Sequence, residues 1–188
     1  MRKWFVVLIG TLLVSACTST PPVQNLPEMT FEHLAPIVLP VAKVDVVNQN
    51  VTSVEGKEIS HRMTTSPAKA MNRWAKDRLQ PGAPDGRAVF TILEASAVEN
   101  KLKKTEGLTG IFTTDQSERY DLSVEGRLDI YDGLGKKKGF ASAKAHRYIS
   151  VSEDTSLLQL EKKWYELLEK LMADFNQAME DNIRSQSF

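Results

Sequence analysis

The chain has 188 residues, of which 41% are hydrophobic and 26% charged, and its 24 Lys and Arg residues balance its 24 Asp and Glu residues. This length and apolar content provide one ordinary hydrophobic core. The zero net charge excludes a basic field for nucleic acid and a general electrostatic attraction to anionic lipid.

The first 16 residues have the order of an export signal. A basic dipeptide at residues 2–3 is followed by an almost unbroken apolar run over residues 4–14. A membrane-spanning helix needs roughly 20 apolar residues, so this run is too short to be one. Small residues then precede Cys17, the only cysteine of the chain. We therefore expect residues 1–16 to be a signal peptide that is removed.

The segment Leu13-Val14-Ser15-Ala16-Cys17 resembles the lipobox of bacterial lipoproteins, in which an aliphatic residue and two small residues precede a cysteine. The resemblance implies a diacylglyceryl thioether on Cys17, cleavage before it, and a further acyl chain such as palmitate on the new amino group. A lone cysteine agrees with this, because exported proteins normally pair their cysteines. The other interpretation is an ordinary secretory signal followed by a spare cysteine.

The residue after Cys17 is Thr18. In the sorting rule of enteric Gram-negative lipoproteins, an Asp at that place retains the protein at the inner membrane. The resemblance therefore implies a lipid-anchored protein on the periplasmic side of the outer membrane rather than the inner membrane. Residues 17–36 are rich in Pro and polar residues and predict a flexible tether, with a single periplasmic domain over residues 37–188.

Alternation of apolar and polar residues predicts a first strand over residues 37–47, with an edge or bulge near Pro40. Ser66 and Pro67 have the types expected at the cap and first position of a helix, which the Pro81-Gly82 dipeptide would end.

Three further strands are expected in the second half, over residues 87–99, 120–130 and 139–151, with a hairpin turn at residues 132–135 between the last two. The last strand carries small residues that leave room for a bulky neighbour: Ala141, Ala143 and Ala145.

That neighbour is expected to be a final helix over about residues 156–183, in which Ser156 and Gln159 have capping-box spacing. Its apolar stripe contains Leu160, Trp164, Leu167, Leu168, Leu171, Phe175 and Met179. A helix of this length spans about 42 Å. A sheet of four strands would not cover all of it, so we expect its end to project or to meet a partner.

The predicted fold class is α+β, in two layers. An antiparallel sheet of about four strands carries two helices on one face, and the last helix is long. The open face of the sheet is expected to be polar, and Trp74 and Trp164 are expected to anchor the core.

No residue pattern predicts a catalytic, cofactor or metal site. The histidines His33, His61 and His146 are scattered, and no nucleophile motif is present. Carboxylates alternate along one strand at Asp121 and Asp129 with an arginine between them, which favours a salt-bridged surface. We expect a protein that is not an enzyme and has no cofactor.

The loop over residues 105–116 is long for a hairpin connection. It contains three apolar residues, Leu108, Ile111 and Phe112, which are candidates for contact with a partner or with lipid. Alternatively, they lie under the sheet as part of the core.

Asn72-Arg73-Trp74-Ala75 and the order of the elements resemble the auxiliary lipoproteins of Gram-negative lipid-transport ABC systems. The resemblance implies a non-enzymatic component of envelope assembly or transport that acts through an envelope protein partner. Two alternatives stay open: a lipid-binding carrier, with an acyl chain between the helices and the alanines of the last strand, and a structural envelope lipoprotein without a ligand.

Overall fold

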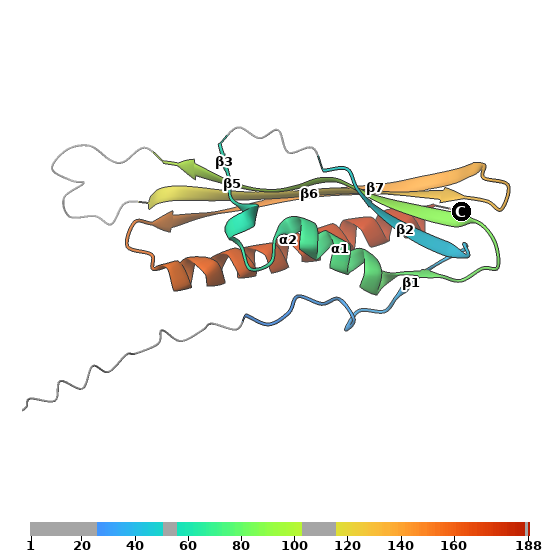
Figure 1. Cartoon of the computed structure of the whole chain (residues 1–188), viewed down its shortest axis with the longest axis horizontal. Helices are drawn as coiled ribbons and strands as arrows, with labels where there is room; N and C mark the ends of the chain where they lie inside the picture. Colours follow the sequence, from blue (N-terminus) through green and yellow to red (C-terminus); the bar gives the residue numbers. More distant parts are fainter. Residues whose placement is uncertain (1–25, 51–55, 103–115, 187) are drawn as a thin grey trace, which may run out of the picture.

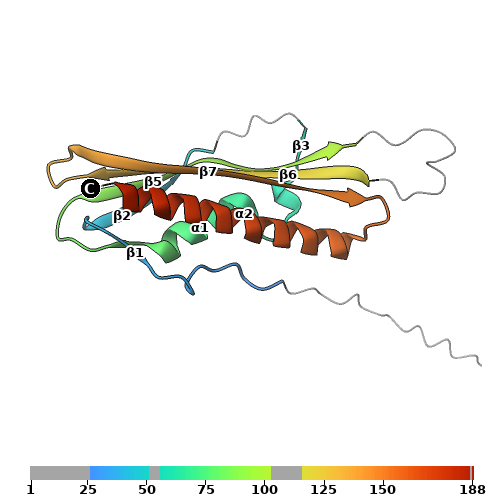
Figure 2. The same cartoon turned by 180° about the vertical axis from the view of Figure 1, so that it is seen from behind.

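The computed structural model of the chain describes residues 26–50, 56–102, 116–186 and 188. The fold has two layers, a long sheet and two helices that cover one of its faces (Figure 1, Figure 2). In chain order the elements are β1 (Ile37–Leu39), β2 (Lys43–Asn48), β3 (Lys57–Glu58), the 3-10 turn η1 (Ser60–Arg62), α1 (Pro67–Arg78), β4 (Leu79–Pro81), β5 (Arg87–Lys101), β6 (Gln116–Tyr131), β7 (Lys137–Ser152) and α2 (Leu157–Ser185). The predicted α+β class and the long final helix are confirmed.

The main sheet has five strands, in the order β2-β5-β6-β7 with β3 also paired to β5. β5, β6 and β7 are antiparallel neighbours, as predicted. β2 pairs with β5 in parallel, so the sheet is mixed and the antiparallel prediction is wrong at this strand. The reason is the crossover through α1, which returns the chain to the same end of the sheet. The strand predicted over residues 37–47 is divided near Pro40, and its first part forms a separate parallel pair with β4.

Both helices begin as their sequences predict. The Ser66 side chain accepts a hydrogen bond from the Lys69 backbone N–H (3.3 Å), and Pro67 is the first residue of α1. Ser156 and Gln159 form a complete capping box at the start of α2. Local sequence therefore decides where each helix begins.

The sheet covers α2 along its length, so the expectation of a projecting end is wrong. β6 and β7 have 16 residues each, which at 3.3 Å per residue makes about 53 Å. The 29 residues of α2 span about 44 Å. Buried residues of α2 run from Leu160 to Ile183. The number of strands sets the width of the sheet, but the length of the strands decides how much of α2 the sheet covers.

An aromatic cluster joins α1, β5 and α2 in the core. The ring centroids of Trp74 and Phe90 lie 5.3 Å apart, and those of Trp74 and Phe175 lie 5.1 Å apart. Gly126 of β6 makes room for this cluster, because a Cβ atom there would lie 2.7 Å from Cζ of Phe90. The small residues of β7 are buried in the same layer: Ala141, Ala143 and Ala145. Both predictions, a tryptophan anchor and a helix against the alanines, are confirmed.

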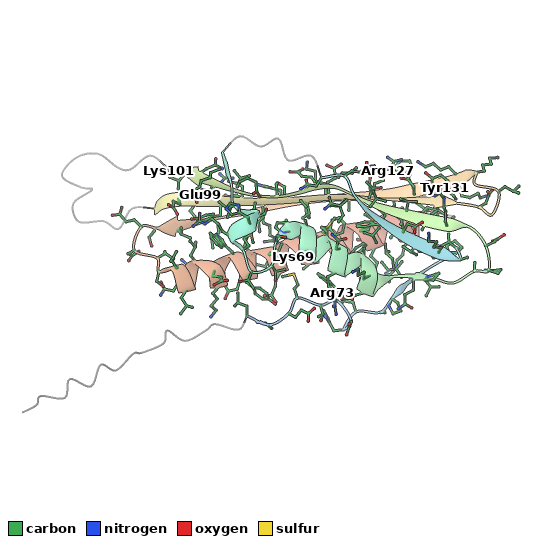
Figure 3. The ribbon with its side chains drawn as sticks, viewed as in Figure 1. Lys69, Arg73, Glu99, Lys101, Arg127 and Tyr131 are labelled. Carbon is green, nitrogen blue, oxygen red and sulfur yellow. The ribbon has the colours of Figure 1, made fainter. Side chains whose placement is uncertain are left out.

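Residues 26–36, which we call the strap, pack against the helices, although the sequence assigned them to the flexible tether. Met29 and Phe31 are buried in the core. The Phe31 backbone N–H donates to Oδ2 of Asp77 in α1 (2.8 Å). Arg73 of α1 forms ion pairs with three carboxylates: Glu28 (3.1 Å), Glu32 (2.7 Å) and Asp77 (2.9 Å) (Figure 3). The boundary of the packed domain therefore lies nearer to the N-terminus than residue 37.

Candidate functional site

The residues predicted to act as sites are not among those that the structure describes. Cys17 and the apolar loop residues Leu108, Ile111 and Phe112 all lie outside the described ranges. Within those ranges, neither helix is long and apolar enough to cross a membrane.

The three histidines lie apart from one another. His33 is in the strap, His61 is in η1 with Nδ1 3.7 Å from Glu58, and Nε2 of His146 on β7 lies 3.1 Å from Asp121. The described part of the chain contains no group of three or more His, Cys, Asp or Glu residues that could hold a metal ion.

The face of the sheet turned away from the helices, the outer face, carries no further layer in the described part of the chain (Figure 1). Its carboxylates form ion pairs: Asp121 with Arg119, Asp129 with Arg127 and Lys137, and Glu125 and Glu94 with Lys144. Burial alone would raise the pKa of Asp121, but hydrogen bonds from Arg119, Asn100 and His146 hold it below its usual value. The predicted polar, salt-bridged face is confirmed.

An arginine, an aspartate and an aromatic ring form a repeated unit on the outer face. In the first unit, Nη2 of Arg119 lies 2.7 Å from Oδ1 of Asp121. The Arg119 guanidinium carbon lies 3.8 Å from the ring centroid of Tyr148, which stands opposite Asp121 on β7. The carboxylate therefore helps to hold the guanidinium over the ring.

The second unit has the same construction eight residues further along β6. Nε of Arg127 lies 3.1 Å from Oδ1 of Asp129, and the guanidinium carbon lies 4.0 Å from the ring centroid of Phe140, opposite Asp129. Figure 3 shows Arg127 on the side of the sheet away from the helices. Eight residues of strand separate the two units by about 26 Å. The rings stay accessible, with Phe140 46% and Tyr148 57% exposed.

Both rings belong to β7, which is an edge strand. Among the described residues, β7 pairs with β6 only. One backbone group of this edge, the Ser142 carbonyl, accepts a hydrogen bond from Nδ2 of Asn182 in α2 (2.7 Å). The two units therefore border a 16-residue strand edge that offers further backbone donors and acceptors.

A cavity of about 460 Å³ lies where β5 ends and β6 begins, next to the start of α2. Its walls include Arg62, Lys101, Leu102, Val151, Leu157 and Leu160. Apolar and charged side chains thus share the lining. We call this end of the domain the open end, and the end with the β6-β7 turn the hairpin end.

A polar cluster lies beside this cavity. Glu99 of β5 is 7% exposed, and its Oε2 lies 2.7 Å from Nη1 of Arg62. The Arg62 guanidinium lies over the Trp164 ring, 5.3 Å from its centroid. Burial, and then a hydrogen bond to Glu118, raise the pKa of Tyr120, so its phenol stays neutral. The cluster consists of paired charges and a neutral phenol, which is typical of a structural network rather than of acid-base chemistry.

These features differ in how far the sequence indicates them. Arg62 and Glu99 are 37 residues apart, and nothing in the sequence indicates that they meet. The Arg-x-Asp repeat of β6, in contrast, is visible at positions 119–121 and 127–129. The register of the β6-β7 hairpin would have placed an aromatic residue opposite each aspartate.

The comparisons with known proteins do not identify a family for this chain. No family model matches the chain, and no curated protein matches it. The crystal structure of rare lipoprotein B from Shewanella oneidensis is similar with a TM-score of 0.37 and 11% sequence identity, over 74% of this chain and 92% of that chain. A likeness of this size carries no conclusion about the family, partners or location of this chain.

Proposed function

We propose that this chain is a non-enzymatic lipoprotein of the Gram-negative envelope, anchored through Cys17 at the periplasmic side of the outer membrane. It acts in envelope assembly or transport by binding a protein partner. The lipobox-like segment supports the anchor. The pair of arginine-aspartate-aromatic units on the outer face is the observation that supports binding to a protein partner.

The two units have the composition of a protein-binding surface. Tyrosine and arginine are enriched among residues that contribute most to protein-protein affinity. Each guanidinium is already held by an aspartate, so binding orders few additional side-chain rotamers. Alternating charges would suffice to keep a solvent-facing sheet soluble. The exposed rings of Phe140 and Tyr148 are therefore better explained by a partner that covers them.

The partner surface is placed along β7 because the units and the free strand edge coincide there. A partner that adds a strand to β7 gains backbone hydrogen bonds, and the rings supply side-chain contacts. The apolar stripe of α2 supports no second surface, because the sheet covers it. The proposal assigns no catalysis to the outer face, and the ion pairs of its carboxylates support a binding role instead.

Photo-cross-linking in the bacterium of origin tests this surface. A photoreactive amino acid is placed at Phe140, at Tyr148, or at Leu134 as a control. Leu134 is 97% exposed in the turn next to β7, so it reports non-specific collisions. We expect one defined product from positions 140 and 148 that is absent at position 134. The R119A/R127A double variant should weaken this product at least several-fold.

Two results would contradict the proposal. Equal products from all three positions would show that the outer face binds nothing selectively. No product at any position would favour the alternative of a structural lipoprotein without a partner. The anchor is tested separately, by mass spectrometry of the N-terminal peptide, which should carry acyl chains on Cys17 and lose them in the C17S variant.

In the alternative of a lipid-binding carrier, the lipid would bind at a different site from the one that the sequence suggested. The space over Ala141, Ala143 and Ala145 is filled by α2, so it is not available to an acyl chain. The cavity at the open end, with Leu102, Val151 and Leu160 in its walls, is the feature that favours a lipid. Native mass spectrometry of the C17S protein decides, because a ligand-free species under mild conditions rejects the carrier.

A further inference from the structure

We propose that the strap turns the open end of the domain toward the membrane that holds Cys17, and that Leu157 and Leu158 at the start of α2 contact its lipid. The inference rests on the lipid anchor of the proposed function. It adds an orientation and a second membrane contact, neither of which follows from an anchor alone.

The strap runs parallel to α2, from the open end at Leu26 to the hairpin end at residue 36. Residues 35–40 share a groove with the last turns of α2, at Glu180 and Ile183. Residues 29–34 share the next groove with the middle of α2, at Met172 and Asn176. Leu26 lies near Trp164 and Tyr165, close to the start of α2. Figure 2 shows the same course beneath the helices. The chain therefore leaves the described domain at the open end.

Specific contacts hold the strap in this course. Arg73 binds carboxylates on both sides of Phe31, and the Phe31 N–H donates to Asp77. Met29 and Phe31 are 7% and 6% exposed. Apolar burial and charge pairing thus act on the same short segment. Without these contacts, the chain would leave the domain at β1, near the hairpin end.

The length of chain before the strap limits the orientation. Leu26 is nine residues from Cys17, a distance of at most about 32 Å when fully extended. The sheet is about 53 Å long. Leu26 lies beside Trp164, whose ring packs on Tyr120, eleven residues before the end of β6. If the hairpin end faced the membrane, Leu26 would therefore lie at least about 36 Å above it, out of reach of the anchor. The domain therefore stands on its open end or lies along the surface.

Two adjacent leucines are exposed at that end. Leu157 is 78% exposed, and its neighbour Leu158 is 44% exposed. Charges that line the cavity beside Leu157 cancel: Arg62 and Lys101 against Glu118 and Glu153. The expected contact is therefore insertion of leucine side chains at the headgroup boundary, without a requirement for anionic lipid.

Depth-dependent fluorescence quenching tests the orientation. The acylated full chain is reconstituted in phosphatidylcholine vesicles after mass spectrometry has verified the acyl chains. Acylation leaves Cys17 without a free thiol, so a cysteine introduced by L158C or L134C is labelled alone with an environment-sensitive dye. A spin label near the lipid headgroup should quench the dye at position 158 at least twice as strongly as at position 134. Addition of anionic lipid should leave this ratio unchanged.

The R73A variant tests the role of the strap. Released from α1, the chain between Cys17 and Pro36 reaches at most about 65 Å, and the domain loses its preferred end. The quenching ratio should fall toward one. R147A is the control, because Arg147 of β7 is a surface arginine whose ion pair is with Asp174 of α2 and not with a residue of the strap.

Each outcome bears on one claim. Equal quenching at both positions in an acylated protein overturns the orientation and leaves the anchor intact. A ratio that R73A does not change overturns the role of the Arg73 ion pairs in orienting the domain. Absence of acyl chains on Cys17 overturns the proposed anchor, and this inference with it.

Discussion

The two buried tryptophans mark the two ends of the space between sheet and helices, and their surroundings differ. Nε1 of Trp74 donates to Oδ1 of Asn176 (2.9 Å), and the ring packs against Phe90 and Phe175. Nε1 of Trp164 is buried and has no hydrogen-bond partner among the described residues. Buried polar groups are normally hydrogen-bonded, so hydrogen bonding is less complete at the Trp164 end.

Charged residues strengthen the contrast. Arg78 is 2% exposed, and it binds Asn176 through Nε (3.0 Å) and Glu180 through Nη2 (2.5 Å). This network joins α1 to α2 and closes the Trp74 end. The Trp164 end instead adjoins the cavity beside Arg62. One end of the layer thus stabilises the fold, while the other stays accessible for contacts outside it.

Removal of Arg78 should have the largest effect on stability. Arg78→Ala leaves Glu180 without its buried partner, at an expected cost of about 3 kcal/mol in the free energy of unfolding. Urea denaturation measures this loss. Arg184→Ala removes the other arginine bound to Glu180, but Arg184 is exposed, and the expected cost is below about 0.5 kcal/mol. Equal losses would contradict the view that the Trp74 end is a closed network.

Addition of a methyl group at Gly126 should have the second-largest effect on stability. Its Cβ would lie 2.7 Å from Cζ of Phe90 and 3.0 Å from Cε of Met71. Gly126→Ala should therefore overpack the Trp74 end and cost about 2 kcal/mol. Ser123→Ala, on the outer face of the same strand, serves as control. A neutral Gly126→Ala variant would show that the aromatic cluster has spare space.

The two tryptophans can be compared directly with the same substitution. Trp74→Phe loses ring volume and the hydrogen bond to Asn176. Trp164→Phe loses ring volume but no hydrogen bond, and it removes a buried unpaired N–H. The first variant should be less stable than the second by about 1 kcal/mol in urea denaturation. The opposite order would mean that the Trp164 N–H is satisfied in solution, for example by a bound water.

Acidic pH should have the smallest effect on stability, and it should act mainly through the carboxylates of the outer face. Burial alone would raise the pKa of Asp129, but hydrogen bonds from Lys137 and Arg127 hold it below the model-compound value of 3.8. A lowered pKa stabilises the folded state above the unfolded-state pKa, and this contribution is lost as the pH falls through the folded-state pKa. The free energy of unfolding, measured by urea denaturation, should thus decline below about pH 4, by less than about 1 kcal/mol for this carboxylate. Asp129→Asn should flatten that decline, and an unchanged decline would assign it to other groups.

The sequence alone predicted those features that depend on neighbouring residues. The capping box of Ser156, the turn between β6 and β7, and the alternation of β6 all appear in the structure as predicted. The apolar stripe of α2 and the salt-bridged outer face followed from periodicity. Local backbone preferences and side-chain periods of two and 3.6 residues need no knowledge of the rest of the chain.

Tertiary structure alone decided how distant segments meet. A register shift around Leu93 of β5 turns Glu99 toward the helices, where it meets Arg62, although uniform alternation from Phe90 would place Glu99 on the outer face. The parallel pairing of β2 and the docking of the strap on Arg73 likewise join segments tens of residues apart. Such contacts depend on the packing of whole layers, and a pattern within a short window carries no information about them.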